Sequence, residues 1–277
     1  MSFYHIPVFA RFQWLNHPQV VRLLRHHLSS SSSRGRRGYN KILLMRWLMY
    51  KQLMRCSYRD LESMTHIDYS TFIKFRQRLV AHNWFLLTLE RVSARVLPEK
   101  SHTLVIDSSF VETYSRHHEG GARYSGHKEK IGFKLHQIID YASRLPVFQS
   151  ITHGAVADVR AGAALIRAAP SLLNVKAFLA DKGYDSASFV DVIHAHWGTH
   201  VRVAIPVRHM HGNAKNHRLK YAERSRSKRL YKKRTAIERY FSRKKYVFHL
   251  GEERTRGLKN FEANCYLTSI MECLEWG

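Results

Sequence analysis

The run HTLVIDSSFVETY, residues 102–114, decides the fold because it is the first of three strand-like segments in series. It is rich in β-branched and apolar residues, and a polar, glycine-containing stretch without helical periodicity follows it at 117–130. Two further apolar runs, GFKLHQIID (132–140) and LPVFQSITH (145–153), are separated only by YASR, which is typical of a β-hairpin. The region therefore predicts three consecutive strands, the last two paired with each other.

Downstream of this hairpin, helical and strand-like patterns alternate. Serial strands followed by such alternation describe an α/β domain with a mixed sheet, and the order matches the ribonuclease-H-like fold, in which the first strand lies beside the fourth. The predicted elements are a helix at 157–170, a strand at 175–181, a helix at 186–198 and a strand at 199–208.

Upstream of the first strand, residues 40–97 have helical periodicity that stops at Pro98. Ser57 is placed to begin one helix, and Asp68 or Ser70 to cap the next. The pair resembles a helix-turn-helix, although a purely structural helical bundle fits the pattern nearly as well. The expected domains are an N-terminal segment with a Ser/Arg/Gly linker (1–38), an all-helical domain (39–98), and a ribonuclease-H-like catalytic domain with a basic C-terminal helical part (99–277).

The charge balance indicates a polyanionic partner. The 277 residues include 46 Lys and Arg against 21 Asp and Glu, a net charge of +25, which favours nucleic acid. In the helical domain, Arg76 and Arg78 are expected to contact DNA. No apolar run approaches the roughly 18 residues that span a bilayer, and the N-terminus lacks the pattern of a secretory leader. We expect a cytoplasmic, DNA-associated protein that does not interact with membranes.

Several carboxylates occupy positions that suit catalysis or metal binding. Asp107 lies within or just past the apolar run LVI, and Asp181 ends the run AFLA, positions at which open sheets present functional groups. Either aspartate alone also fits an acid that begins a turn. Asp158 and Asp185 are expected to cap the helices that follow them. Combined with Glu238, the two strand aspartates would suit a hard cation, Mg²⁺ with Mn²⁺ as a substitute, and two such ions promote phosphoryl transfer.

The segment YKKRTAIERYFSRKK, residues 231–245, holds Glu238 within a dense run of positive charge. The simplest interpretation is an i,i+4 pair with Arg234. At about 100° per residue, however, one side of a helix here carries Tyr231, Arg234, Glu238 and Lys245. Two, three and six residues separate them, which reproduces the YREK signature of DDE transposases of the insertion-sequence-four and insertion-sequence-five group. An adjoining apolar stripe is expected to anchor this helix on the sheet: Leu230, Ile237, Phe241 and Phe248.

Other segments resemble the same family. LVIDSSFVE (104–112) is similar to its first-aspartate strand, SGHKEKIGFKLHQIID (125–140) to the entry of its second strand, and LADKGYDS (179–186) to its second-aspartate motif. The resemblance covers roughly residue 104 to the C-terminus. It implies a transposase that binds the terminal inverted repeats of an insertion sequence, cleaves to free 3′-OH ends, and transfers them to target DNA.

The resemblance also implies roles for individual residues. Asp107, Asp181 and Glu238 would be the catalytic metal ligands, and a homodimer is expected when two ends are paired. Two other functions remain open: a non-catalytic DNA-binding protein derived from a transposase, and a structure-selective nuclease, which would not need the Tyr, Arg and Lys of the signature. The side chains expected on DNA, besides Arg76 and Arg78, are Tyr231, Arg234, Lys245, Lys128 and Lys134.

Overall fold

The computed structural model describes residues 18, 22, 39–97, 101–169, 173–207, 229–252 and 256–276. The linker expected within 1–38 lies outside the described residues, apart from the two isolated positions. So does most of the basic stretch that precedes Tyr231. Among the residues described, no helix combines the length and the apolar character needed to cross a bilayer.

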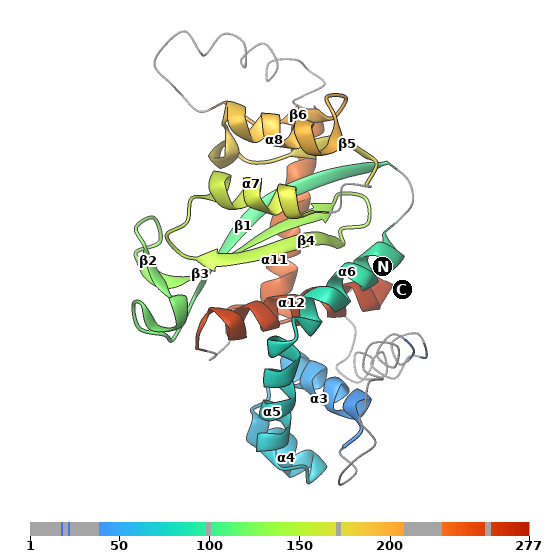
Figure 1. Cartoon of the computed structure of the whole chain (residues 1–277), viewed down its shortest axis with the longest axis vertical. Helices are drawn as coiled ribbons and strands as arrows, with labels where there is room; N and C mark the ends of the chain where they lie inside the picture. Colours follow the sequence, from blue (N-terminus) through green and yellow to red (C-terminus); the bar gives the residue numbers. More distant parts are fainter. Residues whose placement is uncertain are drawn as a thin grey trace.

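A six-stranded mixed sheet forms the centre of the larger part of the molecule (Figure 1). Strand β1 is antiparallel to β3 and parallel to β5, so the first long strand lies beside the first strand of the alternating region, as predicted. The strand order is β2-β3-β1-β5-β6, with β4 pairing with β3. The strands are β1 (His102–Glu112), β2 (Arg123–Ser125), β3 (Lys130–Asp140), β4 (Pro146–His153), β5 (Val175–Leu179) and β6 (Arg202–Ala204).

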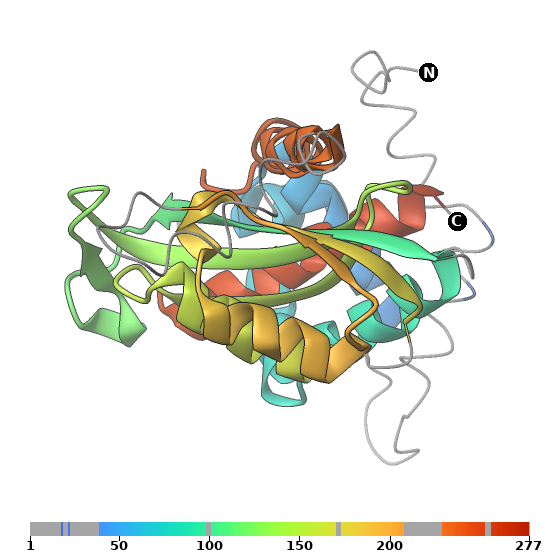
Figure 2. The same ribbon diagram turned by 90° about the horizontal axis from the view of Figure 1, so that it is seen from above.

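Helices cover both faces of this sheet. Helices α7 (Asp158–Ala168) and α8 (Ala187–Trp197) lie on one face, and α11 (Thr235–Val247) lies on the other (Figure 2). Side chains alternate along β1 accordingly, because Leu104 and Ile106 join the α7 and α8 core while Val105 joins the α11 core. The predicted ribonuclease-H-like α/β architecture with preceding helices is thereby confirmed.

The apolar stripe predicted for α11 packs on the sheet only in part: Ile237 and Phe241 join the core between α11 and the sheet, whereas Phe248, just past the helix, joins the cluster of the N-terminal and C-terminal helices. Ile237 and Phe248 are fully buried and Phe241 is nearly so. The helix does not run unbroken from Tyr231, however, because Lys232–Arg234 form a 3-10 turn before α11 begins at Thr235. The signature residues therefore span a change of helix type.

Within residues 39–97, four helices precede the sheet, and the first three begin at a side-chain cap. Ser57 forms a capping box with Asp60 at the start of α4, and the Asp68 side chain accepts the Ser70 N–H at the start of α5. Both caps agree with the sequence-based expectation. The helices are α3 (Lys41–Met54), α4 (Tyr58–Thr65), α5 (Tyr69–Ala81) and α6 (Trp84–Val96).

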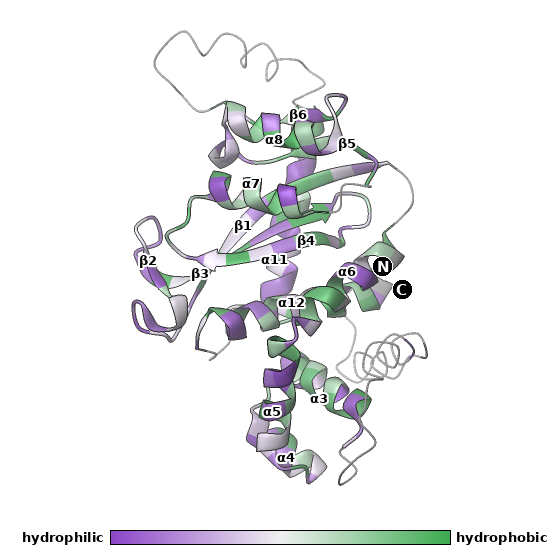
Figure 3. Cartoon of the chain, viewed as in Figure 1, coloured by the Kyte–Doolittle hydropathy of each residue, from purple (hydrophilic) through white to green (hydrophobic). Residues whose placement is uncertain are grey.

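These helices do not enclose a core of their own. The C-terminal helix α12 (Leu258–Trp276) packs against α6, α3 and α5 and also against β4. Its buried Cys273, Ile270 and Met271 belong to the same hydrophobic cluster as the buried residues of α3 to α6. In Figure 3 the ribbon carries the colour of apolar residues where α12 and α6 lie together. The C-terminal helix therefore ties the N-terminal helices to the sheet.

Candidate active site

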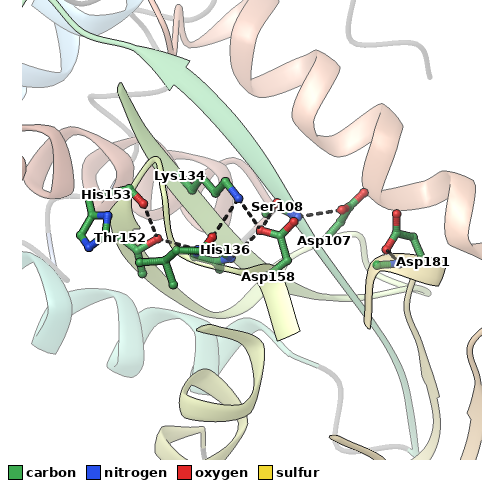
Figure 4. Close-up of polar contacts among 10 residues, drawn as sticks. Asp107, Ser108, Lys134, His136, Thr152, His153, Asp158 and Asp181 are labelled. Carbon is green, nitrogen blue, oxygen red and sulfur yellow. Dashed lines mark hydrogen bonds and ion pairs between the residues drawn. The ribbon is translucent and has the colours of Figure 1, made fainter. Parts of the chain in front are cut away.

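Strands β1 and β5 bring two aspartates to the same level. Their parallel register pairs Leu104 with Phe178 and Val105 with Leu179, so two more residues along each strand lead to Asp107 and Asp181. Asp181 lies two residues past the end of β5, and its side chain accepts the Gly183 N–H at 2.6 Å, starting a 3-10 turn. Figure 4 shows the two carboxylates side by side at this end of the sheet.

Asp107 is held in a poorly hydrated position, with its side chain 21% exposed. Burial raises the pKa of Asp107 to about 6, and the negative charges of Asp181 and Asp158 add to this rise. The Ser108 N–H, which donates to Asp107 Oδ1 at 2.8 Å, and the positive charge of Arg234 act in the opposite direction. A cation placed beside Asp107 and Asp181 would therefore stabilise the charged form of these carboxylates.

Arg234 supplies that cation from the opposite layer. Its Nη1 lies 3.3 Å from Asp107 Oδ2, and its Nη2 forms an ion pair with Glu238 Oε1 on the first turn of α11. The Arg234 guanidinium also lies over the Tyr231 ring, 5.8 Å from its centroid. The i,i+4 pair anticipated from the sequence is therefore present, but the same arginine also reaches Asp107. One guanidinium thus joins the signature helix to the sheet aspartate.

The three carboxylates fit a divalent cation in chemistry, although they are not yet gathered around one. Within the described ranges, no group of three or more His, Cys, Asp or Glu side chains is close enough to hold a metal ion. Arg234 forms an ion pair with each of Asp107 and Glu238 and so occupies the space between their carboxylates. All three acids offer oxygen donors, as hard cations require. The raised pKa of Asp107 comes first from its burial and only then from the nearby charge of Asp181.

Apart from Tyr231 and Arg234, which lie in the site itself, the side chains expected on DNA separate into two groups. Lys128, in the turn between β2 and β3, and Lys245, at the end of α11, are both exposed. Partial desolvation lowers the pKa of Lys245, and the positive charge of Lys128 lowers it further. The second effect shows that the two lysines are neighbours in space. Arg78 is exposed on α5. These three cations are available to an external phosphate.

Arg76 and Lys134 have internal partners instead. Arg76 donates from Nη1 to Asn260 Oδ1 at 2.9 Å and from Nη2 to the Asn260 carbonyl at 2.7 Å, both on α12. Lys134 Nζ donates to Asp158 Oδ1 at 3.1 Å and to the Val156 carbonyl at 2.9 Å. Because Arg76 is held on α12 and Lys134 is held by Asp158 away from the Asp107 side of the sheet, we leave both residues out of the proposed DNA interface.

The N-cap predictions for Asp158 and Asp185 were wrong. Asp158 is the first residue of α7, Ala157 occupies the cap position, and no side chain caps that helix. Asp185 ends the 3-10 turn that starts after Asp181, and Ser186 precedes α8. Asp158 instead turns its carboxylate toward β1 and β3, where partners distant in the sequence satisfy it. The sequence placed an acid at a helix start but gave no sign of these partners.

The mixed sheet, with Asp107 in the middle of β1 and Asp181 just past the neighbouring β5, and with helices on both faces, defines a ribonuclease-H-like domain. Residues 98–274 match the family described as the transposase DDE domain, and the chain belongs to this family. No curated protein matches the chain. A similar solved structure is the piggyBac transposase in a synaptic complex with hairpin DNA, with a TM-score of 0.53 and 10% identity over 98% of this chain and 74% of that one. At this identity, the likeness supports the fold alone.

Proposed function

We propose that the chain is an insertion-sequence transposase of the insertion-sequence-four and insertion-sequence-five group. It binds the terminal inverted repeats of its element, cleaves to free 3′-OH ends, and joins those ends to target DNA. The observation that supports this most directly is the contact of Arg234 with both Asp107 and Glu238. It brings the helix with YREK spacing against the sheet at the point where Asp107 and Asp181 meet.

Asp107, Asp181 and Glu238 are the proposed ligands of Mg²⁺, with Mn²⁺ as a substitute. When bound, a pair of such ions would activate the attacking oxygen and stabilise the leaving oxygen of the phosphodiester. Carboxylates on two adjacent strands and on a helix from the opposite layer provide oxygen donors from three directions.

Arg234 has a second task in this proposal. Its guanidinium balances the acids in the DNA-free protein, and a phosphate of the bound end offers it a competing anionic partner with bidentate geometry. Tyr231, beside the guanidinium, limits the directions in which the Arg234 side chain can turn. Lys128 and Lys245 would contact the backbone of the same strand from the edge of the site.

The helices before the sheet are proposed to form a DNA-binding unit within residues 39–98, with Arg78 on the exposed side of α5. Joining two ends requires two active sites, so we propose a homodimer on paired ends. A DNA-binding protein without catalysis would retain the basic surface, but it would have no use for Asp107 and Glu238 meeting on one arginine beside Asp181.

The test is cleavage of a duplex that carries the flanking repeats of the element, with and without Mg²⁺. Asp107→Asn, Asp181→Asn and Glu238→Gln should each lower cleavage about a thousandfold or more, since metal-supported charge stabilisation supplies several kcal/mol. End binding in a mobility-shift assay should persist. Asp185→Asn, which changes a neighbouring acid outside the proposed set, is the control. Magnesium-dependent cleavage at the wild-type rate by any of the three variants would remove that residue from the site.

A further inference from the structure

A second polar cluster lies on the other face of β1, directly behind the candidate active site. Because side chains alternate along a strand, Asp107 faces the α11 layer while the next residue, Ser108, faces the α7 layer. We call this group the Asp158 cluster (Figure 4); its members are Ser108, Lys134, His136, Thr152 and Asp158.

Asp158 is the centre of this cluster. Its Oδ1 accepts from the Ser108 hydroxyl at 2.9 Å and from Lys134 Nζ at 3.1 Å, and it lies 3.9 Å from His136 Nδ1. The Asp158 and Lys134 side chains are 33% and 16% exposed, so this ion pair is partly screened from water. Lys134 also bonds the Val156 carbonyl and thereby fixes the turn that leads into α7. A single carboxylate therefore connects β1, β3 and the start of α7.

His136 contributes as a neutral neighbour. Its ring is fully buried, and Nε2 lies 2.8 Å from Thr152 Oγ1 on β4. Burial lowers the pKa of His136 to about 4, with the negative charge of Asp158 opposing this shift. The positive charge that balances Asp158 therefore comes from Lys134.

Ser108 links the two faces of the strand. Its hydroxyl donates to Asp158 Oδ1, while its backbone N–H donates to Asp107 Oδ1 at 2.8 Å. The orientation of the Ser108 peptide therefore sets the orientation of the Asp107 carboxylate, and Asp158 restrains that peptide through the hydroxyl. Groups that orient a metal ligand from behind typically change metal affinity 10- to 100-fold when they are removed.

We propose that Asp158 is a positioning residue for Asp107: through the Ser108 hydroxyl and backbone N–H, and with the Lys134 ion pair as its anchor, it fixes the Asp107 carboxylate beside Asp181. This inference rests on the proposed role of Asp107 as a metal ligand. Asp158 itself touches neither metal nor DNA in this scheme. It acts only through Ser108 and the start of α7.

The experiment measures Mn²⁺ affinity of the DNA-free full chain by titration with electron paramagnetic resonance detection. Asp158→Asn should weaken Mn²⁺ binding about 10- to 100-fold, and Ser108→Ala should weaken it by a smaller factor. The double variant should bind no worse than Asp158→Asn alone, because both residues act along one path. Ser108→Ala makes the smaller change and keeps the test usable if Asp158→Asn folds poorly.

Asp140→Asn is the matched control, since it removes a buried carboxylate from the other end of the same strand pair. Asp140 lies opposite Leu104, and its oxygens contact His102 Nδ1 and accept from Ser143. Removal of this carboxylate should lower thermal stability without changing Mn²⁺ affinity. In metal-free protein, hydrogen exchange of β1 peptides containing Ser108 should accelerate in Asp158→Asn more than in Asp140→Asn.

The outcomes separate this inference from the proposed function. If Asp107→Asn loses Mn²⁺ while Asp158→Asn binds it as the wild type does, Asp158 is structural only and the inference is overturned. If Asp107→Asn itself binds Mn²⁺ normally, the proposed metal site is wrong and the inference falls with it. Equally weakened Mn²⁺ binding in Asp158→Asn and Asp140→Asn would also overturn it, because a general loosening of the sheet would then explain both.

Discussion

Arg234 and Asp107 are 127 positions apart in the chain, yet Nη1 of the arginine lies 3.3 Å from Oδ2 of the aspartate. The same guanidinium pairs with Glu238 one helical turn further on. An arginine in this place compensates acids that a divalent cation would otherwise neutralise. The contact therefore makes metal binding, DNA binding and local stability depend on one side chain.

Removing Arg234 should make the DNA-free site bind divalent cations more tightly. In Arg234→Ala, Mn²⁺ no longer competes with the guanidinium, so its affinity should rise about three- to tenfold, on the order of 1 kcal/mol. Calorimetric titration without DNA measures this change. Arg239→Ala, an exposed arginine on the same helix, should leave the affinity unchanged. A lower affinity in Arg234→Ala would mean that the arginine organises the acids instead of competing with the metal.

The pH dependence of stability should report on Asp107. Its pKa rises from 3.8 to about 6 on folding, so the folded state holds a proton that the unfolded state releases between these values. In chelator, the Asp107 contribution to the unfolding free energy should therefore fall as pH rises from about 4 to 6, and then stay constant.

Asp107→Asn removes this titration. Relative to wild type, the variant should gain stability across the same pH window, up to about 3 kcal/mol above pH 6. Urea denaturation at several pH values compares the two proteins. Parallel pH profiles for variant and wild type would show that Asp107 titrates normally in the folded protein.

Lys128 and Lys245 should act together on the DNA backbone. Each single alanine substitution should weaken binding to the terminal repeat and reduce the slope of log affinity against log salt by about one for each phosphate that the variant no longer neutralises. Lys176→Ala is the control, because this exposed lysine lies near the start of β5, at the end of that strand away from Asp181. Slopes that match the wild type in both variants would place the DNA elsewhere.

Arg76 and Arg78 should separate stability from DNA binding. Arg76→Ala removes hydrogen bonds to Asn260 and should cost about 1–3 kcal/mol of unfolding free energy, with an unchanged salt slope. Arg78→Ala should do the reverse, because this side chain is exposed on the same helix. Thermal denaturation and salt-dependent binding of both variants test this. Equal effects of the two substitutions on stability would argue against the role given to the α12 contact.

The sequence determined most of the fold because its signals are local. The β-branched and apolar run from 102 to 114 and the short YASR connection predicted strands, and the caps at Ser57 and Asp68 began helices where expected. A fixed spacing identified Tyr231, Arg234, Glu238 and Lys245 as a set, although their metal-binding and DNA-binding roles remain predictions. Such patterns depend on residues only a few positions apart, so they can be recognised in the sequence without the structure.

Only the tertiary structure decided how charges pair and which elements share a core. Asp158 looked like a helix cap, but its partners come from β1 and β3; Arg76 looked like a DNA contact, but α12 binds it. Ion pairs and hydrogen bonds depend on distance in space, and folding joins residues separated by 24 to 184 positions. The periodicity of a chain fixes which way a side chain faces, whereas the packing of distant elements fixes what it meets.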